Sequence, residues 1–328
     1  MTESLENKRI VSAIVRSEIA VVIPYFQRER GILRRGLRSV FQQRDAPPAN
    51  VIIIDDGSPT SVETEIERFS AEMRARITVI RQSNQGPGPA RNTGLAAVPE
   101  SVRWIAFLDS DDIWHELHLS RAVQLLERGF DFFYADGDVE GEAGSLFRTL
   151  KFDGTGHTPV GDQSLFAFQG DFTATLLKCT PVVTSTVVLR KTRLGTFRFP
   201  SSPGTCEDLL YWLDIASAHP RVGFSVEIEA TGGRAGVHIS HRGDWRSNGS
   251  LRCIADFDRY YRSILGTIPM SSEQRELVRN RYLSNRQSFL ITTLALLKVG
   301  KCPDLSTAFE FLVRNPLATL HRAKSVRT

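Results

Sequence analysis

The sequence predicts an α/β fold with a twisted, mainly parallel sheet, flanking helices and a C-terminal helical extension. Over residues 18–135, short apolar segments alternate with amphipathic helical segments, a pattern typical of parallel sheets. Two of the apolar segments end directly in acids, at Asp55-Asp56 and at Asp109-Ser-Asp-Asp112. With 328 residues, 41% of them hydrophobic, the chain can form one large domain with an appendage.

The first predicted elements alternate regularly. Residues 18–24 form a near-continuous apolar strand, as in a sheet covered on both faces, and Pro24-Tyr25 ends it. Residues 29–43 carry apolar side chains at helical spacing. The elements that follow are a strand at 51–54, a helix at 62–74, a strand at 76–81, a loop at 84–94 that opens a short helix, a strand at 104–108, a helix at 116–128 and a strand at 131–135.

The second part of the chain is less regular. Residues 137–161 are rich in glycine and acids and show little periodicity, which predicts a surface excursion. The predicted elements after it are a helix at 164–178, a strand at 181–190, an irregular stretch at 195–204, a helix at 205–216, a strand at 222–229, a polar loop at 232–249 and helices beyond residue 251. We therefore expect an N-terminal tail at 1–17, a main domain at 18–250 and a helical region at 251–328.

The cysteines and the apolar segments of the sequence indicate the cellular compartment of the protein. The four cysteines have no C-x-x-C spacing, which argues against a zinc site or a disulfide framework and favours the reducing cytoplasm. Residues 1–17 lack the apolar core of a signal peptide, and no apolar run reaches the ~18 residues of a membrane span. We therefore expect a cytoplasmic protein.

The net charge of +4 is unevenly distributed. Residues 251–328 contain 13 Lys and Arg against 6 Asp and Glu, so the rest of the chain is acidic overall. A basic region of this kind is compatible with anionic lipid or with nucleic acid. A solvated helical surface explains it as well; we favour that interpretation and expect no nucleic-acid partner.

The acids that follow the strand at 104–108 are the strongest candidate site. A buried strand that ends in Asp109, Asp111 and Asp112 places them where open α/β sheets bind ligands. Because like charges this close repel one another, a hard divalent cation that also holds a diphosphate would give them a chemical role. A structural role competes with this one, since Ser110 or Asp111 can cap the next helix and Asp112 can favour its dipole.

Two other segments add to this site. Arg91, in the loop at 84–94, is a cation that can meet a phosphate, and the amides at the start of the following helix favour anions. The ends of neighbouring parallel strands converge on one crevice, so Tyr25 and Asp55 are expected near Asp109. A further acidic pair, Glu207-Asp208, opens the predicted helix at 205–216.

Five motifs occur in a recognisable order. They are Val-Val-Ile-Pro-Tyr-Phe at 21–26, Ile-Asp-Asp-Gly-Ser at 54–58, Asn-x-Gly-x-x-x-Ala-Arg-Asn-x-Gly at 84–94, Phe-Leu-Asp-Ser-Asp-Asp at 107–112, and Glu-Asp at 207–208. In this order they resemble the family 2 inverting glycosyltransferases over residues 18–245. The start of the chain and its length also resemble bacterial exopolysaccharide glucosyltransferases of the succinoglycan type. The resemblance implies a Rossmann-like GT-A fold with a donor half at 18–136 and an acceptor half at 137–250.

The resemblance also implies a nucleotide-diphosphate sugar donor and roles for the matched residues. By this match, Pro24, Tyr25 and Glu29 lie near the nucleoside, Asp55 meets the base, Asp56 supports that turn, Arg91 lies near the nucleoside or diphosphate, Asp109 reaches the ribose or the metal, and Asp111 ligates Mn²⁺ or Mg²⁺. Asp208 matches the catalytic base, with Glu207 as the alternative.

One motif departs from the family pattern. Many relatives carry a Tyr-Arg-x-His segment whose histidine helps to hold the diphosphate or the metal, whereas this chain has His238 and His241 without the Tyr-Arg. We favour His241, because Trp245 and Ser247 follow it at a spacing similar to that in the family. The alternative is that both histidines simply belong to a surface loop.

The tryptophans near these motifs carry a weaker signal. Trp114 and Trp245 lie beside site motifs and are candidates for contact with the acceptor sugar. Trp212 lies at core spacing in a predicted helix, so we expect it to pack in the interior.

Three functions compete. The first is an inverting glycosyltransferase that moves glucose or a similar hexose from a UDP-sugar to a glycan acceptor, expected to be lipid-linked, in exopolysaccharide synthesis. The second is a sugar-1-phosphate nucleotidyltransferase, but those enzymes usually have a glycine-rich loop with Arg and Lys where this chain has Pro24-Tyr25-Phe26. The third is a non-catalytic nucleotide-sugar-binding scaffold, against which Asp111 and Asp208 argue.

The C-terminal region is expected to serve association rather than chemistry. Residues 289–299 are apolar but too few to span a bilayer. They suit packing against the main domain or formation of a homodimer. Contact with anionic lipid on the inner face of the plasma membrane is the second choice, because several Arg and Lys residues lie nearby.

Overall fold

The computed structural model describes residues 17–200, 206–233 and 246–314, and the chain forms two compact units. The first unit comprises Met1–Pro203 with Tyr211–Val237, and the second comprises Gly204–Leu210 with His238–Thr328. Helix α9 (Glu207–Ser217) therefore begins in the second unit and continues in the first.

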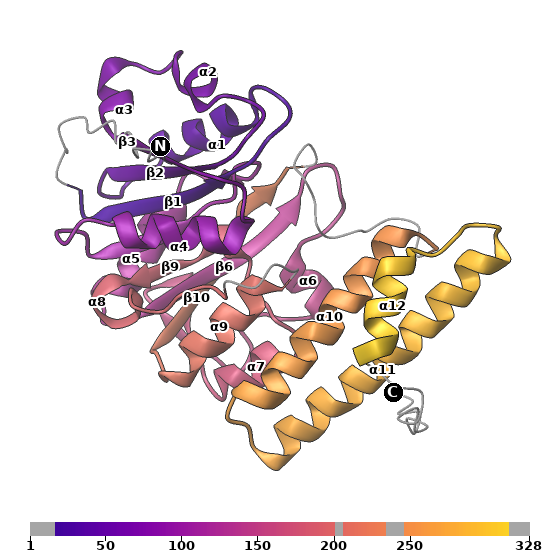
Figure 1. Ribbon diagram of the computed structural model, residues 1–328. Coiled ribbons are helices and arrows are strands. Elements are labelled where there is room, and N and C mark those ends of the chain that lie inside the picture. Colours follow the sequence, from indigo (N-terminus) through magenta and orange to yellow (C-terminus); the bar gives the residue numbers. More distant parts are fainter. Residues whose placement is uncertain (1–16, 201–205, 234–245, 315–328) are drawn as a thin grey trace, which may run out of the picture. The chain divides into compact units, whose positions relative to one another are not determined.

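The N-terminal half of the sheet is parallel, as the alternating pattern predicts. Strand β1 (Ile19–Tyr25) pairs in parallel with β2 (Ala49–Asp56) and with β4 (Trp104–Phe107), and β2 pairs in parallel with β3 (Ile77–Gln82). Figure 1 shows these strands with the helices that connect them. Those helices are α1 (Ile32–Phe41), α2 (Val62–Ile66), α3 (Ala71–Ala75), α4 (Pro87–Ala97) and α5 (His118–Glu127).

The other half of the sheet is mixed. In the described residues the strand order is β3-β2-β1-β4-β9-β6-β10-β8-β7, with β5 paired to β10. Strand β9 (Val188–Arg190) runs antiparallel between β4 and β6 (Phe132–Val139), and β10 (Val222–Gly232) returns parallel to β6. The short strands are β5 (Ile113–Trp114), β7 (Thr158–Val160) and β8 (Asp162–Ala167).

Four predicted elements differ from the structure. The strand expected at 181–190 is reduced to β9, because a 3-10 helix occupies Thr184–Thr186. The helix expected at 62–74 is two short helices, because Ser61 and Ser70 each cap a new helix with the side-chain oxygen. The helix expected at 164–178 begins as strand β8, and α7 (Phe172–Lys178) starts only after the capping residue Asp171. The excursion at 137–161 contains α6 (Leu146–Leu150) and strand β7.

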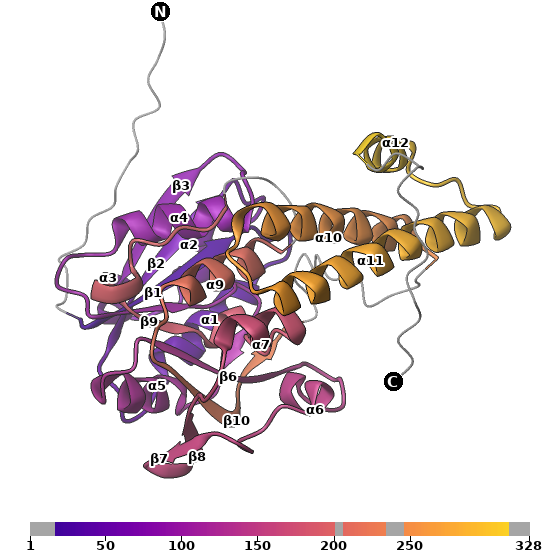
Figure 2. The same cartoon turned by 90° about the horizontal axis from the view of Figure 1, so that it is seen from below.

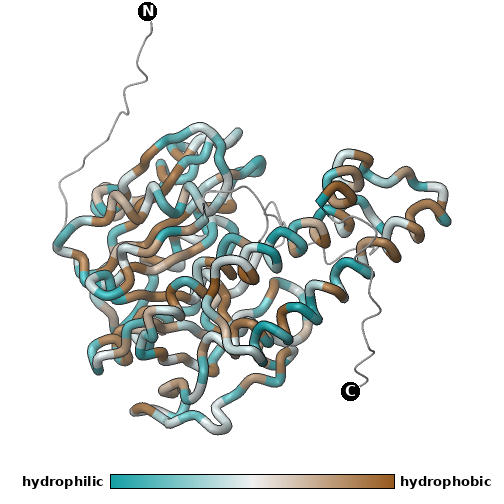
Figure 3. Tube along the Cα trace, turned by 60° about the horizontal axis from the view of Figure 1, so that its bottom comes forward, coloured by the Kyte–Doolittle hydropathy of each residue, from teal (hydrophilic) through white to brown (hydrophobic). Residues whose placement is uncertain are grey.

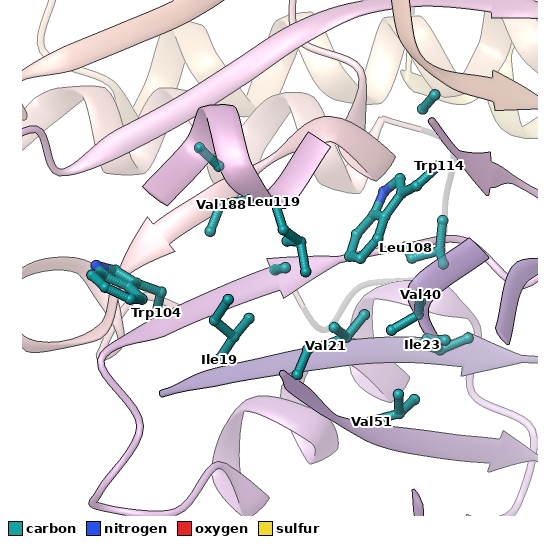
Figure 4. Packing of buried hydrophobic residues seen from close by; sticks show 14 of the residues in the cluster. Ile19, Val21, Ile23, Val40, Val51, Trp104, Leu108, Trp114, Leu119 and Val188 are labelled. Carbon is teal, nitrogen blue, oxygen red and sulfur yellow. The ribbon is translucent and has the colours of Figure 1, made fainter. Parts of the chain in front are cut away.

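The core of the first unit lies on both faces of the parallel strands. On one face, alternate residues of β1 (Ile19, Val21 and Ile23) pack with Trp104 and Leu119, among others, as Figure 4 shows. Helices α1 and α5 cover this face. Helix α4 lies over the opposite face of β1 and β2 (Figures 1 and 2), where a Cβ on Gly94 would come within 2.4 Å of Val22.

Trp212 confirms the prediction that it is a core residue. It is fully buried, and its ring lies 6.0 Å from that of Phe107 and 5.5 Å from that of Phe132. Both rings meet the indole edge to face, an arrangement that aromatic pairs favour. The part of α9 that belongs to the first unit is therefore held against the sheet by aromatic packing.

The second unit is helical, as predicted for the C-terminal region. It consists mainly of α10 (Asn248–Thr267), α11 (Ser272–Lys298) and α12 (Leu305–Arg314). The rings of Phe289 on α11 and Phe311 on α12 stack with centroids 3.6 Å apart, and Leu251 and Leu296 complete this small core. Among the described residues, no helix is both long and apolar enough to cross a membrane.

Candidate functional site

The candidate site is a turn of acids at the carboxyl end of β4, and we call residues 109–112 the acidic turn. Leu108, directly after the strand, donates its backbone N–H to the oxygen of Val22 at 3.2 Å and so prolongs the pairing with β1. The chain then reverses, with the N–H of Asp112 donating to the oxygen of Asp109 at 3.1 Å. The acids thus lie at the edge of a parallel sheet where α/β proteins commonly bind ligands.

Two glycines let other elements approach the backbone of the acidic turn. A Cβ on Gly36 of α1 would lie 3.0 Å from the oxygen of Asp112 and 3.7 Å from that of Ser110. A Cβ on Gly233, just after β10, would lie 2.2 Å from the oxygen of Asp111. Because neither glycine has a side chain, the backbones of α1 and of the segment after β10 pack directly against the acidic turn on two sides.

Ser185 holds the acidic turn from a third side. It is buried in a short 3-10 helix (Thr184–Thr186) just before β9. Its Oγ accepts the backbone N–H of Asp109 at 3.0 Å and donates to Oδ2 of Asp112 at 2.5 Å. The indole Nε1 of Trp114 donates to the backbone oxygen of Ser185 at 2.5 Å. No pattern in the sequence pointed to Ser185, which lies more than 70 residues away in the chain from the acids that it contacts.

The electrostatics of the acidic turn are unfavourable to three negative charges. Burial and, to a smaller extent, the charges of Asp109 and Asp111 together raise the pKa of Asp112 to about 8, against hydrogen bonds from Ser185 and from the N–H of Gly233. A cation placed among these carboxylates would favour the ionised form of Asp112. The turn is therefore suited to a positively charged ligand.

Asp109 is paired with a buried arginine. Arg91 on α4 is only 4% exposed, and its Nη2 donates to Oδ1 of Asp109 at 2.5 Å. Its guanidinium also lies 5.2 Å from the centre of the Phe199 ring. Asn92 fixes the backbone of Phe199 through two hydrogen bonds of 2.8 Å. The sequence-predicted residues Arg91 and Asp109 thus lie together, with one oxygen of Asp109 committed to the arginine.

The turn after β2 contains the other predicted acids. Asp55 pairs with Tyr25 across β1 and β2, and its Oδ1 accepts the N–H of Ser58 at 2.9 Å. Burial is the main cause that raises the pKa of Asp55, while Arg81, 3.6 Å from Oδ2, lowers it. This carboxylate is therefore buried beside the end of β1.

Asp56 holds the loop that leads into α4. Its Oδ1 accepts the side-chain amide of Gln82 at 2.8 Å and the N–H of Gln85 at 2.9 Å, and its Oδ2 accepts the N–H of Gly86 at 2.8 Å. Gly86 has a φ of 92°, in the left-handed region that favours glycine. Asp56 thus positions the start of the helix that carries Arg91.

Gln27 joins the turn after β2 to the acidic turn. Its side-chain amide donates to Oγ of Ser110 at 2.9 Å, and both residues are buried. Its backbone N–H donates to Oγ of Ser58 at 3.0 Å, while its backbone oxygen accepts that hydroxyl at 3.1 Å and the N–H of Thr60 at 3.1 Å. Sequence reasoning missed Gln27, although it directly follows the matched Pro-Tyr-Phe motif.

The remaining predicted residues near the sheet lie in different environments. Pro24 and Tyr25 are buried at the end of β1; Tyr25 is 1% exposed, and burial raises its pKa to about 12. Glu29 is exposed in the segment before α1. Trp114 is 4% exposed and packs in the core, so the hypothesis that it contacts an acceptor sugar is wrong.

The predicted catalytic acids belong to the second unit. Glu207 and Asp208 are half-buried in the first turn of α9, and Oδ1 of Asp208 accepts the backbone N–H of Leu209 at 2.8 Å. Both acids favour the dipole of this helix. The other predicted residues of this part, His238, His241 and Trp245, lie outside the described residues.

The structure also tests whether the site could hold a metal ion. Within the described part of the chain, no group of three or more His, Cys, Asp and Glu side chains is arranged to hold one. Mg²⁺ bound together with a nucleotide needs no such cage, because one or two carboxylates, water and phosphate oxygens complete its coordination. The acidic turn, with Asp109, Asp111 and Asp112, offers carboxylates for such a shared site.

The comparison with protein families decides the identity of this domain. Residues 20–182 match the family model described as glycosyl transferase family 2. The chain belongs to glycosyl transferase family 2. The matched range includes the turn after β2, helix α4, the acidic turn and β6, so the predicted family is confirmed on the segments that build the site.

Sequence relatives of this glycosyltransferase chain include proteins of glycan synthesis. The succinoglycan biosynthesis protein ExoW of Rhizobium meliloti is 52% identical over 112 residues, which are 34% of this chain and 35% of that protein. The UDP-Glc:alpha-D-GlcNAc-diphosphoundecaprenol beta-1,3-glucosyltransferase WfgD of Escherichia coli is 27% identical over 205 residues, 60% of this chain and 69% of that protein. The matches to the first relatives span only 30 to 35% of their lengths.

Solved structures confirm the GT-A fold of the glycosyltransferase. The S. aureus TarS fragment 1–349 in complex with UDP-GlcNAc matches with a TM-score of 0.57 at 18% identity, covering 83% of this chain and 73% of that one. The mannosyltransferase PcManGT of Pyrobaculum calidifontis, in complex with GDP-Man and Mn²⁺, matches with a TM-score of 0.57 at 15% identity, covering 96% and 84%. At these identities the likeness concerns the fold.

Proposed function

We propose that the chain is an inverting glycosyltransferase that moves a hexose, glucose by preference, from a UDP-sugar to a glycan acceptor. The family and the fold support a glycosyltransferase that uses a nucleotide sugar. ExoW is named for succinoglycan biosynthesis, and WfgD for transfer of glucose from UDP-Glc to a diphosphoundecaprenol-linked sugar. By this likeness we assign the chain to exopolysaccharide synthesis with a lipid-linked acceptor, at the cytoplasmic face of the membrane.

The observation that carries the proposal is the pairing of two donor-binding turns at one edge of the sheet. The turn at Asp55 and the acidic turn follow strands that flank β1, and Gln27 joins them by hydrogen bonds to Ser58 and Ser110. A nucleoside diphosphate has a base at one end and a charged diphosphate at the other. In the proposed complex, the base and nucleoside lie at Asp55, Tyr25 and Glu29, and the diphosphate lies at the acidic turn.

We assign to the acidic turn the binding of a divalent ion that balances the negative charge of the diphosphate leaving group. A bound Mn²⁺ or Mg²⁺ would supply positive charge to balance the diphosphate leaving group. Asp111 would hold this ion, with Asp109 and His241 as further proposed ligands. Arg91 orients Asp109 through its hydrogen bond, and the second oxygen of Asp109 can then accept a ribose hydroxyl.

The base must come from another part of the chain. Inversion requires a group that removes the acceptor proton while the hydroxyl attacks the sugar from the face opposite the diphosphate. The metal ligands are on the leaving-group side and cannot do this. We assign the base to Asp208, at the start of α9, with Glu207 as the alternative.

A UDP-release assay tests the donor half of the proposal. The chain is given a panel of UDP-sugars with Mn²⁺ or Mg²⁺, and with a membrane lipid extract as the acceptor source. Asp111→Asn should abolish release, while Glu67→Gln, which changes an exposed acid at the end of α2, should not alter it. Full turnover in EDTA would contradict the metal role. Pyrophosphate release from UTP and glucose 1-phosphate, with no transfer from UDP-sugars, would identify a nucleotidyltransferase instead.

The base assignment has its own test. Asp208→Asn should keep donor affinity and stability near those of the parent and lower turnover by on the order of 10²-fold or more. If the residue only supports the helix, the same change should cost stability of about 1 kcal/mol and leave turnover intact. Loss of turnover in Glu207→Gln but not in Asp208→Asn would move the base by one residue. The anomeric configuration of the product, read by NMR, checks inversion.

A further inference from the structure

The second unit exposes an unusual share of apolar side chains. Of the nine large hydrophobic residues that are exposed in the described part of the chain, eight lie between residues 291 and 313. The ninth, Leu117, is only 36% exposed. Single exposed hydrophobics are common on protein surfaces, but a concentration of them in one segment marks an interaction surface.

Helix α12 is apolar on two faces. Phe311 faces the small core and stacks on Phe289. Leu305, Phe309, Leu312 and Val313 are 71, 73, 45 and 65% exposed, and their spacing of four, three and one residues places them on one side of the helix. Among the residues of α12, only Phe311 is buried, so most of this wide apolar surface is left exposed and suits an interaction with a partner.

The end of α11 continues this pattern. In the segment 289–299, Phe289 and Leu296 are buried in the small core of the second unit. Ile291, Leu294 and Leu297 lie on the same helix and are 59, 66 and 57% exposed. Figure 3 shows hydrophobic residues along the end of α11 and in α12. We call the exposed apolar residues of 305–313, together with Lys298 and Lys301 before them, the α11–α12 face.

The charges around this face are positive. The two acids of residues 289–314 are engaged in ion pairs: Asp304 with Arg252 at 2.6 Å, and Glu310 with Arg259 at 3.3 Å and Arg314 at 2.7 Å. Lys298 and Lys301 are exposed in the connection between the two helices, and Lys301 donates to a backbone oxygen, which leaves its charge in place.

The sequence after α12 adds further positive charge. Residues 315–328, which follow α12, contain three Lys or Arg and no acid. Two copies of such a region would repel each other when brought face to face, whereas an anionic surface would attract both the helices and the segment that follows. Charge complementarity therefore selects an anionic partner over a second copy of the chain.

We propose that the α11–α12 face binds the surface of a bilayer that contains anionic phospholipids. The apolar side chains of α12 enter the boundary between headgroups and acyl chains, and Lys298 and Lys301 meet the lipid phosphates. The contact is peripheral, because no helix among the described residues can cross the membrane. The proposal does not depend on the enzymatic activity.

Vesicle co-sedimentation of the full chain tests the proposal. The chain should sediment with vesicles of phosphatidylcholine mixed with phosphatidylglycerol, and much less with phosphatidylcholine alone. Phe309→Ser should weaken partition by about tenfold or more, because it removes the largest and most exposed apolar side chain of α12. Leu117→Ser, which changes an exposed apolar residue of the first unit, is the matched control and should bind like the parent.

A second pair of variants tests the contribution of the lysine charges to vesicle binding. Lys298→Glu with Lys301→Glu should reduce binding to the mixed vesicles, and added salt should reduce binding of the parent. A double variant with Arg68→Glu, in the turn after α2, and Arg74→Glu, on α3, makes the same change of net charge and should bind like the parent. Equal binding of the Phe309→Ser variant and the parent would overturn the proposal. The proposal would also be overturned if the parent did not bind vesicles and instead formed a dimer in analytical ultracentrifugation that Phe309→Ser dissociates.

Discussion

Replacing Asp109 with asparagine removes the negative charge that faces the buried guanidinium of Arg91. The neighbouring acid Asp111 offers a matched change in the same turn, and Asp111→Asn leaves the pair of Arg91 and Asp109 intact. We expect Asp109→Asn to destabilise the first unit clearly more than Asp111→Asn does. Both variants lose one carboxylate near Asp112, so relief of repulsion within the turn is similar for the two.

The expected difference follows from the burial of the two partners. Breaking a fully buried ion pair costs about 3–5 kcal/mol, because the remaining charge has no partner. The Asp109 side chain is 34% exposed, so water can partly solvate the guanidinium once the carboxylate is gone. The 2.5 Å hydrogen bond is charge-assisted, a class that contributes about 1.5–3 kcal/mol. We therefore expect Asp109→Asn to cost about 2 kcal/mol, and Asp111→Asn to cost about 0.5 kcal/mol or less.

Urea unfolding in EDTA measures both variants without any contribution from bound metal. The tryptophans of the first unit, Trp104 and Trp212 among them, report its unfolding by fluorescence. A double-mutant cycle with Arg91→Met isolates the pair, and we expect a coupling free energy of about 1.5 kcal/mol or more.

Equal free energies of unfolding for the two single variants would refute this reasoning. So would a coupling free energy near zero between Arg91→Met and Asp109→Asn. Either result would mean that the guanidinium is stabilised mainly by its contact with Phe199 and by other neighbours, rather than by the carboxylate.

Three further predictions concern the surroundings of the acidic turn. Gln27→Leu and Ser110→Ala should each cost about 1–2 kcal/mol, with a coupling of about 1 kcal/mol in urea unfolding, because each leaves a buried polar partner without its bond; additive losses would contradict the bridge. The pKa of Asp112 is raised from 3.8 to about 8, so the folded state binds the extra proton in this window, and stability should fall as pH rises through it. In EDTA, Asp112→Asn should therefore gain stability relative to the parent between about pH 5 and pH 8, and a constant difference would argue against the shift. Gly36→Ala should lower the midpoint of thermal unfolding, because its Cβ would meet the oxygen of Asp112 at 3.0 Å, whereas Gly266→Ala, a helical site with no atom within 4 Å, should raise it.

The sequence by itself determined the parallel half of the sheet and the acids at its edge. In β1, β2 and β4, nearly every residue is apolar, and this pattern is visible without any knowledge of partners. Asp55 and Asp109 follow or end these strands directly, so chain connectivity alone places them at the carboxyl edge. Where a functional residue is adjacent in sequence to the strand that carries it, the sequence alone is sufficient to place that residue in the fold.

The tertiary structure alone decided what holds those acids in place. Ser185 lies 73 residues from Asp112, Gln27 lies 83 from Ser110, and Gly233 lies 121 from Asp112. A serine or a glutamine that forms one hydrogen bond across such a distance leaves no periodicity in the sequence, because its residue type is common and its partner is unknown. The same holds for residues 289–299, whose uniform apolar character does not tell which side chains pack on Phe311 and which stay exposed. Only the packing of α11 against α12 makes that division.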